Sequence, residues 1–125
     1  MKYEKVAVIF IGTDKYLNFL PEWYQRCEKN FLPTIQKQYF VFSDGKIEGM
    51  PTNISAYPEE HRPWPFITLL RFSSILKAED ELKDYDWIIF LDADAFVVDT
   101  VQAEELLTHK PFIGVHHPCL SLIHI

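Results

Sequence analysis

Two aspartates separated by one residue are the strongest chemical signal in this sequence. Asp92 and Asp94 directly follow the apolar run at residues 87–91, which is typical of a short buried strand. If the backbone stays extended past that run, both carboxylates point to the same side and Ala93 points away. Two carboxylates this close repel each other unless a cation lies between them, and a hard divalent ion that shares oxygens with a diphosphate is its natural occupant. The alternative is a pair of turn aspartates that cap the following helix.

A second acidic pair and one arginine bear on the same site. Asp84 and Asp86 precede the strand that Asp92 follows. Ligands bind outside the carboxyl ends of the strands in open α/β sheets, so position favours Asp92 and Asp94 and leaves the earlier pair as a solvated turn. Arg71 lies among apolar residues, where an unpaired guanidinium is costly to bury. We expect it to pair with Asp92, Asp94 or a ligand oxygen, or else to form a structural ion pair.

The elements that must position these residues alternate between strands and helices. Residues 6–11 form a continuous apolar run, typical of a central strand that is covered on both faces. Trp23, Cys27 and Phe31 recur at four-residue spacing until Pro33, which indicates a helix with one core-facing stripe. Residues 39–42 and 53–57 are interpreted as the second and third strands.

A second helical pattern separates the third strand from the acidic pair. Pro65 can open a helix that carries the apolar residues Phe66, Leu69, Leu70, Phe72 and Leu76. Beyond residues 87–91 we expect a short helix at 101–107 and a last strand at 111–115. Strands that alternate with helices predict an α/β fold with a mostly parallel sheet and helices on both faces.

Composition excludes several classes of protein. The 12 basic and 18 acidic residues give a net charge of −6, which disfavours a nucleic-acid binder. The 48% of apolar residues can build a core, so the chain is not disordered. Its longest apolar runs are far shorter than the roughly 20 residues of a membrane-spanning helix, and no signal-peptide pattern is present. We therefore expect a cytoplasmic protein, at most peripheral to a membrane. Cys27 and Cys119 are expected to be buried or unreactive thiols.

The ordered motifs resemble those of glycosyltransferase family 6, the retaining enzymes that include the blood-group A and B transferases, the α-1,3-galactosyltransferases and smaller bacterial relatives. The motifs are Lys15-Tyr16 after the first strand, Cys27-Glu28-Lys29 before Phe31, Tyr39-Phe40-Val41-Phe42-Ser43-Asp44, Trp64 seven residues before Arg71, Leu91-Asp92-Ala93-Asp94, and Gly114-Val115-His116-His117-Pro118. Each motif alone is unspecific, and their order carries the resemblance.

The resemblance implies a GT-A, Rossmann-like fold that binds a UDP-sugar at the carboxyl ends of its strands. Such an enzyme moves galactose or N-acetylgalactosamine to a hydroxyl of a glycan acceptor and retains the anomeric configuration. Phe10, Ile11 and Tyr16 match the segment that receives the uridine, where an aromatic ring offers a stacking face to the base. A core role is the alternative for Phe10 and Ile11. Arg71 matches the arginine that contacts the donor near its sugar.

The resemblance also assigns a metal and an acceptor residue. Asp92 and Asp94 match the manganese-binding pair, and both carboxylates are present where many bacterial relatives have Asn-x-Asn and work without metal. We therefore expect Mn²⁺ or another divalent cation, which would stabilise the charge that develops on the β-phosphate of the leaving UDP. His117 matches the histidine of a Gly-x-x-His-Pro segment that contacts the acceptor. Asp44 is expected to form a turn.

The resemblance covers only part of a family member. Residues 1–119 correspond to the N-terminal, donor-binding half of a GT-A domain, so the acidic catalytic residue is expected beyond this sequence. Residues 120–125 resemble the translation of a sequencing adaptor, with an ordinary apolar strand as the alternative. The residues present do not choose between the two donor sugars.

Two other functions stay open. The chain could bind UDP and transfer nothing. It could also be a haloacid-dehalogenase-type phosphatase that uses Asp92 as its nucleophile. That class prefers Thr or Val where this chain has Phe96, and it carries its Asp-x-Asp on the first strand rather than late in the chain.

Overall fold

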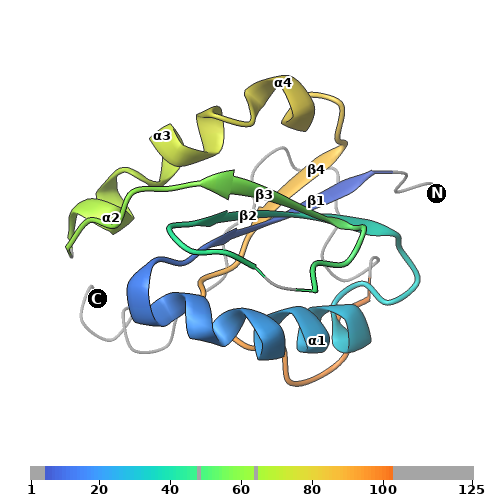
Figure 1. Cartoon of the computed structure of the whole chain (residues 1–125). Coiled ribbons are helices and arrows are strands. Elements are labelled where there is room, and N and C mark those ends of the chain that lie inside the picture. Colours follow the sequence, from blue (N-terminus) through green and yellow to red (C-terminus); the bar gives the residue numbers. More distant parts are fainter. Residues whose placement is uncertain (1–4, 48, 64, 103–125) are drawn as a thin grey trace, which may run out of the picture.

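The computed structural model describes residues 5–47, 49–63 and 65–102 (Figure 1). The elements are β1 (Val6–Ile11), the 3-10 helix η1 (Asp14–Phe19), α1 (Leu20–Asn30), β2 (Lys37–Ser43), β3 (Ile54–Pro58), α2 (Phe66–Leu69), α3 (Arg71–Leu76), α4 (Glu79–Leu82) and β4 (Trp87–Phe90). The predicted alternation of strands and helices is confirmed over these residues. None of the helices within them is both long enough and apolar enough to cross a membrane.

The strands form a 4-stranded sheet in the order β3-β2-β1-β4, and every pairing in it is parallel. The central strand β1 pairs with β2 along its whole length and with β4 over Val6 to Ile9. The chain runs outward from β1 to β2 and β3 and then crosses to the other side of β1. This reversal makes the carboxyl ends of β1 and β4 a topological switch point, the place where open α/β sheets hold ligands.

Helices cover both faces of the sheet (Figure 1). On one face Val8 and Phe10 of β1 pack with Trp23 of α1, and on the other Ile9 packs with Leu82 of α4. Residues Val6 to Phe10 are all 0% exposed. Burial on both faces explains why the run is continuously apolar rather than alternating. The α/β class, the parallel sheet and its two-sided cover are as predicted.

Helix α1 follows the predicted pattern closely. Pro21 lies in its first turn, Trp23 and Cys27 are fully buried, and Phe31 follows its last residue. Burial raises the pKa of the Cys27 thiol to about 12, so the thiol stays protonated at neutral pH. Cys27 is buried as predicted, and Cys119 lies outside the described residues.

The helix expected after Pro65 differs from its prediction. It is broken into α2 and α3 at Leu70, whose φ of −97° and ψ of 13° are not helical. The break interrupts the i, i+4 stripe, and the apolar side chains that the stripe would bury are instead exposed: Phe66 55%, Leu69 68%, Phe72 68% and Leu76 61%. Ile75, Ala78 and Leu82 cover the sheet in their place.

The expected helix at 101–107 does not begin at Val101. Val101 forms an isolated parallel bridge with Phe31; its N–H donates to the Asn30 carbonyl at 2.8 Å, and its carbonyl accepts from the Leu32 N–H at 2.9 Å. Val101 is therefore part of a strand-like bridge and not the first residue of a helix. Residues 103–107, the strand expected at 111–115 and the tail at 120–125 lie outside the described residues.

Candidate functional site

A cavity of about 420 Å³ opens at the switch point, where β1 and β4 end. It draws residues from the end of β1, from η1, from the β3–α2 loop, from the start of α3 and from the turn after β4. The lining residues are Ile11, Gly12, Thr13, Tyr16, His61, Arg62, Arg71, Phe90, Asp92, Ala93 and Asp94. The edge of the sheet predicted for a ligand is therefore hollowed, and both acidic residues of the Asp-x-Asp lie in it.

The Asp-x-Asp converges on the cavity through a turn, not through the extended backbone that we expected. The Ala95 N–H donates to the Asp92 carbonyl at 3.0 Å and closes the turn. Ala93 is 7% exposed and packs into the core on the α1 face of the sheet, whereas Asp92 and Asp94 are exposed. Core burial of the small middle residue thus directs the two flanking carboxylates into one cavity.

Arg71 also lines this cavity, at the first position of α3. Its guanidinium carbon is 4.7 Å from the centroid of the Phe90 ring, a cation–π contact. The side chain is half-buried rather than enclosed, and its apolar neighbours Leu69, Leu70 and Phe72 are exposed. Arg71, Asp92 and Asp94 thus line one cavity, whereas the expected apolar surroundings of the arginine are largely exposed.

The three residues expected near the base separate into core and cavity. Phe10 is 0% exposed, and its ring packs edge-on against Trp23 with the centroids 5.0 Å apart. It belongs to the core, so its ring offers no stacking face to a base. Ile11 and Tyr16 line the cavity, and Tyr16 is 42% exposed. A Cβ at Gly12 would lie 2.5 Å from Cε1 of Phe10, which shows how tightly core and cavity meet at this point.

Sequence reasoning missed Thr13, His61 and Arg62, which also line the cavity. The Thr13 side chain is 2% exposed, and its Oγ1 is 2.8 Å from Nδ1 of His61. His61 and Arg62 follow β3 much as Asp92 follows β4. Because carboxyl ends of parallel strands meet at one edge of a sheet, the polar residues after the third strand were the signal that could have found them.

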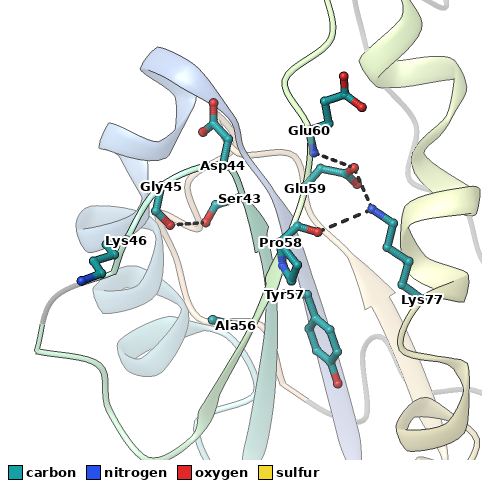
Figure 2. Close-up of a pocket in the computed structure, with 10 residues that line it drawn as sticks. All are labelled: Ser43, Asp44, Gly45, Lys46, Ala56, Tyr57, Pro58, Glu59, Glu60 and Lys77. Atoms are coloured by element: carbon teal, nitrogen blue, oxygen red, sulfur yellow. Dashed lines mark hydrogen bonds and ion pairs between the residues drawn. The ribbon is translucent and has the colours of Figure 1, made fainter.

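A buried carboxylate anchors the loop that carries His61. The Glu59 side chain is 0% exposed, and its Oε1 accepts hydrogen bonds from Lys77 Nζ at 3.0 Å and from the Glu60 N–H at 3.1 Å (Figure 2). It also lies 3.4 Å from a guanidinium nitrogen of Arg62. Burial raises the pKa of Glu59, but the hydrogen bonds around it and the charge of Lys77 outweigh burial and lower the pKa below its ordinary value.

A second, more open cavity of about 750 Å³ lies where β2 and β3 end (Figure 2). Asp44 lies at its rim, exposed, and its Oδ1 accepts from the backbone N–H of Asp14 at 3.0 Å. Asp14 adopts a positive φ of 54°, so this bond holds a strained residue at the start of η1. Asp44 therefore lies in the bend that follows β2, as expected, and its side chain also ties that bend to the start of η1.

The earlier acidic pair lies at the opposite edge of the sheet. Asp84 and Asp86 are exposed and come just before β4 begins. The Asp86 carboxylate accepts from the backbone N–H of Lys5 at 3.2 Å. The prediction of a solvated turn is confirmed for this pair.

The donor set available to a metal is small. Among residues 5–47, 49–63 and 65–102, no group of three or more His, Cys, Asp or Glu side chains could hold an ion. Asp92 and Asp94 together fit a divalent cation only as a partial set of oxygen ligands. A bound diphosphate and water would have to complete the coordination, as the sequence led us to expect. Trp64 and His117 lie outside the described residues.

A comparison with curated proteins identifies a relative. The chain is 32% identical over 115 residues to the O-antigen biosynthesis glycosyltransferase WbnI of Escherichia coli. The match covers 90% of this chain and 49% of the relative, so the chain spans about half the length of the protein it resembles. No protein-family model matches the chain. By this similarity, the chain is a homologue of a glycosyltransferase.

Proposed function

We propose that this chain carries the nucleotide-sugar site of a glycosyltransferase. The observation that carries the proposal is the cavity at the β1–β4 switch point, where Tyr16, Arg71, Asp92 and Asp94 meet in a chain that is 32% identical to a glycosyltransferase. Its volume of about 420 Å³ falls within the ordinary range for small-molecule sites. The switch point is also where Rossmann-like sheets bind nucleotides.

Each cavity residue has a role that follows from its chemistry. Asp92 and Asp94 would hold a divalent cation, Mn²⁺ by preference, together with the oxygens of a diphosphate. When bound, that cation offsets the negative charge on the departing nucleotide. Arg71, supported by the Phe90 ring, binds oxygens of the donor. Tyr16 and Ile11 provide the surface for the uracil base, and Tyr16 replaces Phe10 as the stacking ring.

The proposal extends to a specific reaction. The chain belongs, by the motifs it carries, to glycosyltransferase family 6, and it takes UDP-galactose or UDP-N-acetylgalactosamine. The sugar passes, with retention at its anomeric carbon, to a hydroxyl of a glycan such as the O-antigen named for the relative. A phosphatase role for Asp92 finds no support, because the Asp-x-Asp follows the fourth strand in the chain and the relative is a glycosyltransferase.

Calorimetric titration of UDP into the full 125-residue chain, with and without Mn²⁺, tests the site. We expect Mn²⁺-dependent binding that Asp92→Asn combined with Asp94→Asn weakens by about tenfold or more, the scale of hydrogen bonds and ion contacts to charged groups. The matched control is Asp84→Asn combined with Asp86→Asn, which removes the same charge at the opposite edge of the sheet. Unchanged affinity in the first double variant, or no heat at millimolar UDP in the wild type, would refute the proposal.

Two further measurements test the preference for uracil and the phosphatase alternative. Replacing UDP by ADP or GDP tests the base preference, and equal affinities would refute the role of Tyr16 and Ile11 in recognising uracil. Incubation with a generic phosphate ester and Mn²⁺ or Mg²⁺ tests the phosphatase alternative. Release of phosphate that depends on Asp92 would favour that alternative over nucleotide-sugar binding.

A further inference from the structure

One histidine is held at the cavity wall by a buried hydroxyl. Thr13 follows β1 and is 2% exposed, whereas His61 comes from the β3–α2 loop and is exposed. The 2.8 Å contact between Thr13 Oγ1 and His61 Nδ1 joins segments that are 48 residues apart in the sequence. If the hydroxyl donates this bond, the imidazole proton stays on Nε2. The second ring nitrogen then has a donor to offer and makes no hydrogen bond to another described residue.

The loop that carries His61 is anchored independently of Thr13. Glu59, two residues before the histidine, is buried and paired with Lys77 at the end of α3. Arg62, the next residue after His61, lies 3.4 Å from the same carboxylate. Glu60 and Arg62, the chain neighbours of His61, both contact the Glu59 carboxylate. The hydroxyl of Thr13 therefore needs only to set the orientation of the ring and not the position of the loop.

The charges around the cavity indicate what His61 contacts. Arg62 and Arg71 line it together with His61, and Asp92 and Asp94 face the same space. A diphosphate with its divalent cation matches this pattern, because the metal lies on the carboxylates while phosphate oxygens accept hydrogen bonds from the cationic wall. Ile11 and Tyr16, the less polar part of the lining, are left for the base.

We infer that His61 donates a hydrogen bond from Nε2 to a diphosphate oxygen of the bound nucleotide, and that Thr13 is the positioning residue that holds the ring in this tautomer and orientation. The inference rests on the proposed nucleotide-sugar site. It adds a ligand contact from the β3–α2 loop and a buried residue that acts only through that contact.

Affinity measurements with UDP, UMP and uridine in Mn²⁺ test the contact. His61→Ala should weaken UDP binding about tenfold, as expected for a hydrogen bond to a charged group, and leave uridine binding within about twofold. Thr13→Val should weaken UDP binding about threefold or more, and Thr13→Ser, which keeps the hydroxyl, should restore it. Thr52→Val, at an exposed threonine in the β2–β3 connection, is the matched control.

A double-mutant cycle tests whether Thr13 acts through His61. In the His61→Ala background, Thr13→Val should cause no further loss of UDP affinity, because the hydroxyl then has no ring to orient. The ¹⁵N spectrum of the imidazole gives a readout that does not depend on binding: among neutral rings, the fraction in the Nε2–H form should be higher in the wild type than in Thr13→Val.

The outcomes distinguish this inference from the function on which it rests. Absence of UDP binding by the wild type would overturn both. Wild-type binding that His61→Ala leaves unchanged, or that His61→Ala weakens equally for UDP and uridine, would overturn the inference alone. Additive losses in the double variant would overturn the role of Thr13.

Discussion

The burial of Phe10 predicts opposite effects of two aromatic substitutions on stability and on ligand binding. Phe10→Leu removes a ring that is 0% exposed and that packs edge-on against Trp23 at 5.0 Å. Loss of the aromatic pair costs about 0.5–1.5 kcal/mol and the change of shape up to about 1.5 kcal/mol, so we expect a total of about 0.5–3 kcal/mol. For a domain of this size that lowers Tm by roughly 2–12 °C. UDP affinity should change by less than about threefold, because the ring does not reach the cavity.

Tyr16→Ala should show the reverse pattern. The side chain is 42% exposed, so its removal should change stability by only about 0.5 kcal/mol. If Tyr16 stacks on the base, UDP affinity should fall by about 1–3 kcal/mol, or roughly fivefold to 150-fold. Thermal unfolding followed by circular dichroism gives the first quantity, and calorimetric titration of UDP in Mn²⁺ gives the second.

The control for Phe10→Leu is Phe42→Leu, which truncates an equally buried ring on β2 that stacks on Tyr57 and is not among the residues that line the cavity. Both leucine variants should be destabilised and should still bind UDP. A Phe10→Leu variant that keeps the wild-type Tm but loses UDP affinity would refute this reasoning and restore Phe10 as a base-stacking residue.

Three further predictions follow from the packing and the ionisation of buried groups. Gly12→Ala should lower the free energy of unfolding by about 1–3 kcal/mol in urea titrations, because the new Cβ would lie 2.5 Å from Cε1 of the packed Phe10 ring; wild-type stability would show that the ring moves freely. The pKa of Glu59 lies below its ordinary 4.5, so its carboxylate stabilises the fold above that value and the contribution is lost as the pH falls through the lower, folded-state pKa. Urea unfolding between pH 6 and 3 should therefore show a smaller loss of stability for Glu59→Gln than for the wild type, and parallel curves would contradict this. In a Cys119→Ser background, Cys27 should react with a disulfide reagent at pH 8 only as fast as the chain unfolds, because burial raises its pKa to about 12; rapid labelling of the folded protein would contradict its burial.

Much of the fold could be predicted from local sequence patterns. The apolar run of β1 and the four-residue spacing of α1 depend only on which residues face the core, and this periodicity is visible in the chain itself. The position of Asp92 and Asp94 at the end of a strand follows from the same pattern together with a general rule for parallel sheets. That much of the candidate site was accessible without coordinates.

Other features depended on contacts that no local pattern contains. An aromatic residue at a strand end can belong to the core or to a ligand site, and only the packing of α1 against β1 placed Phe10 in the core. The break at Leu70 likewise exposed side chains that an uninterrupted helix would have buried. In both cases tertiary packing overrode a correct local tendency.

Local patterns were enough to predict the strands and helix α1, since backbone hydrogen bonding and apolar periodicity act over a few neighbouring residues. That Thr13, His61 and Arg71 share one cavity with the acidic pair became visible only in the folded chain. Their meeting depends on the strand order β3-β2-β1-β4, which is set by how whole elements pack on both faces of the sheet. Long-range packing of this kind brings together residues whose separation in the chain carries no signal.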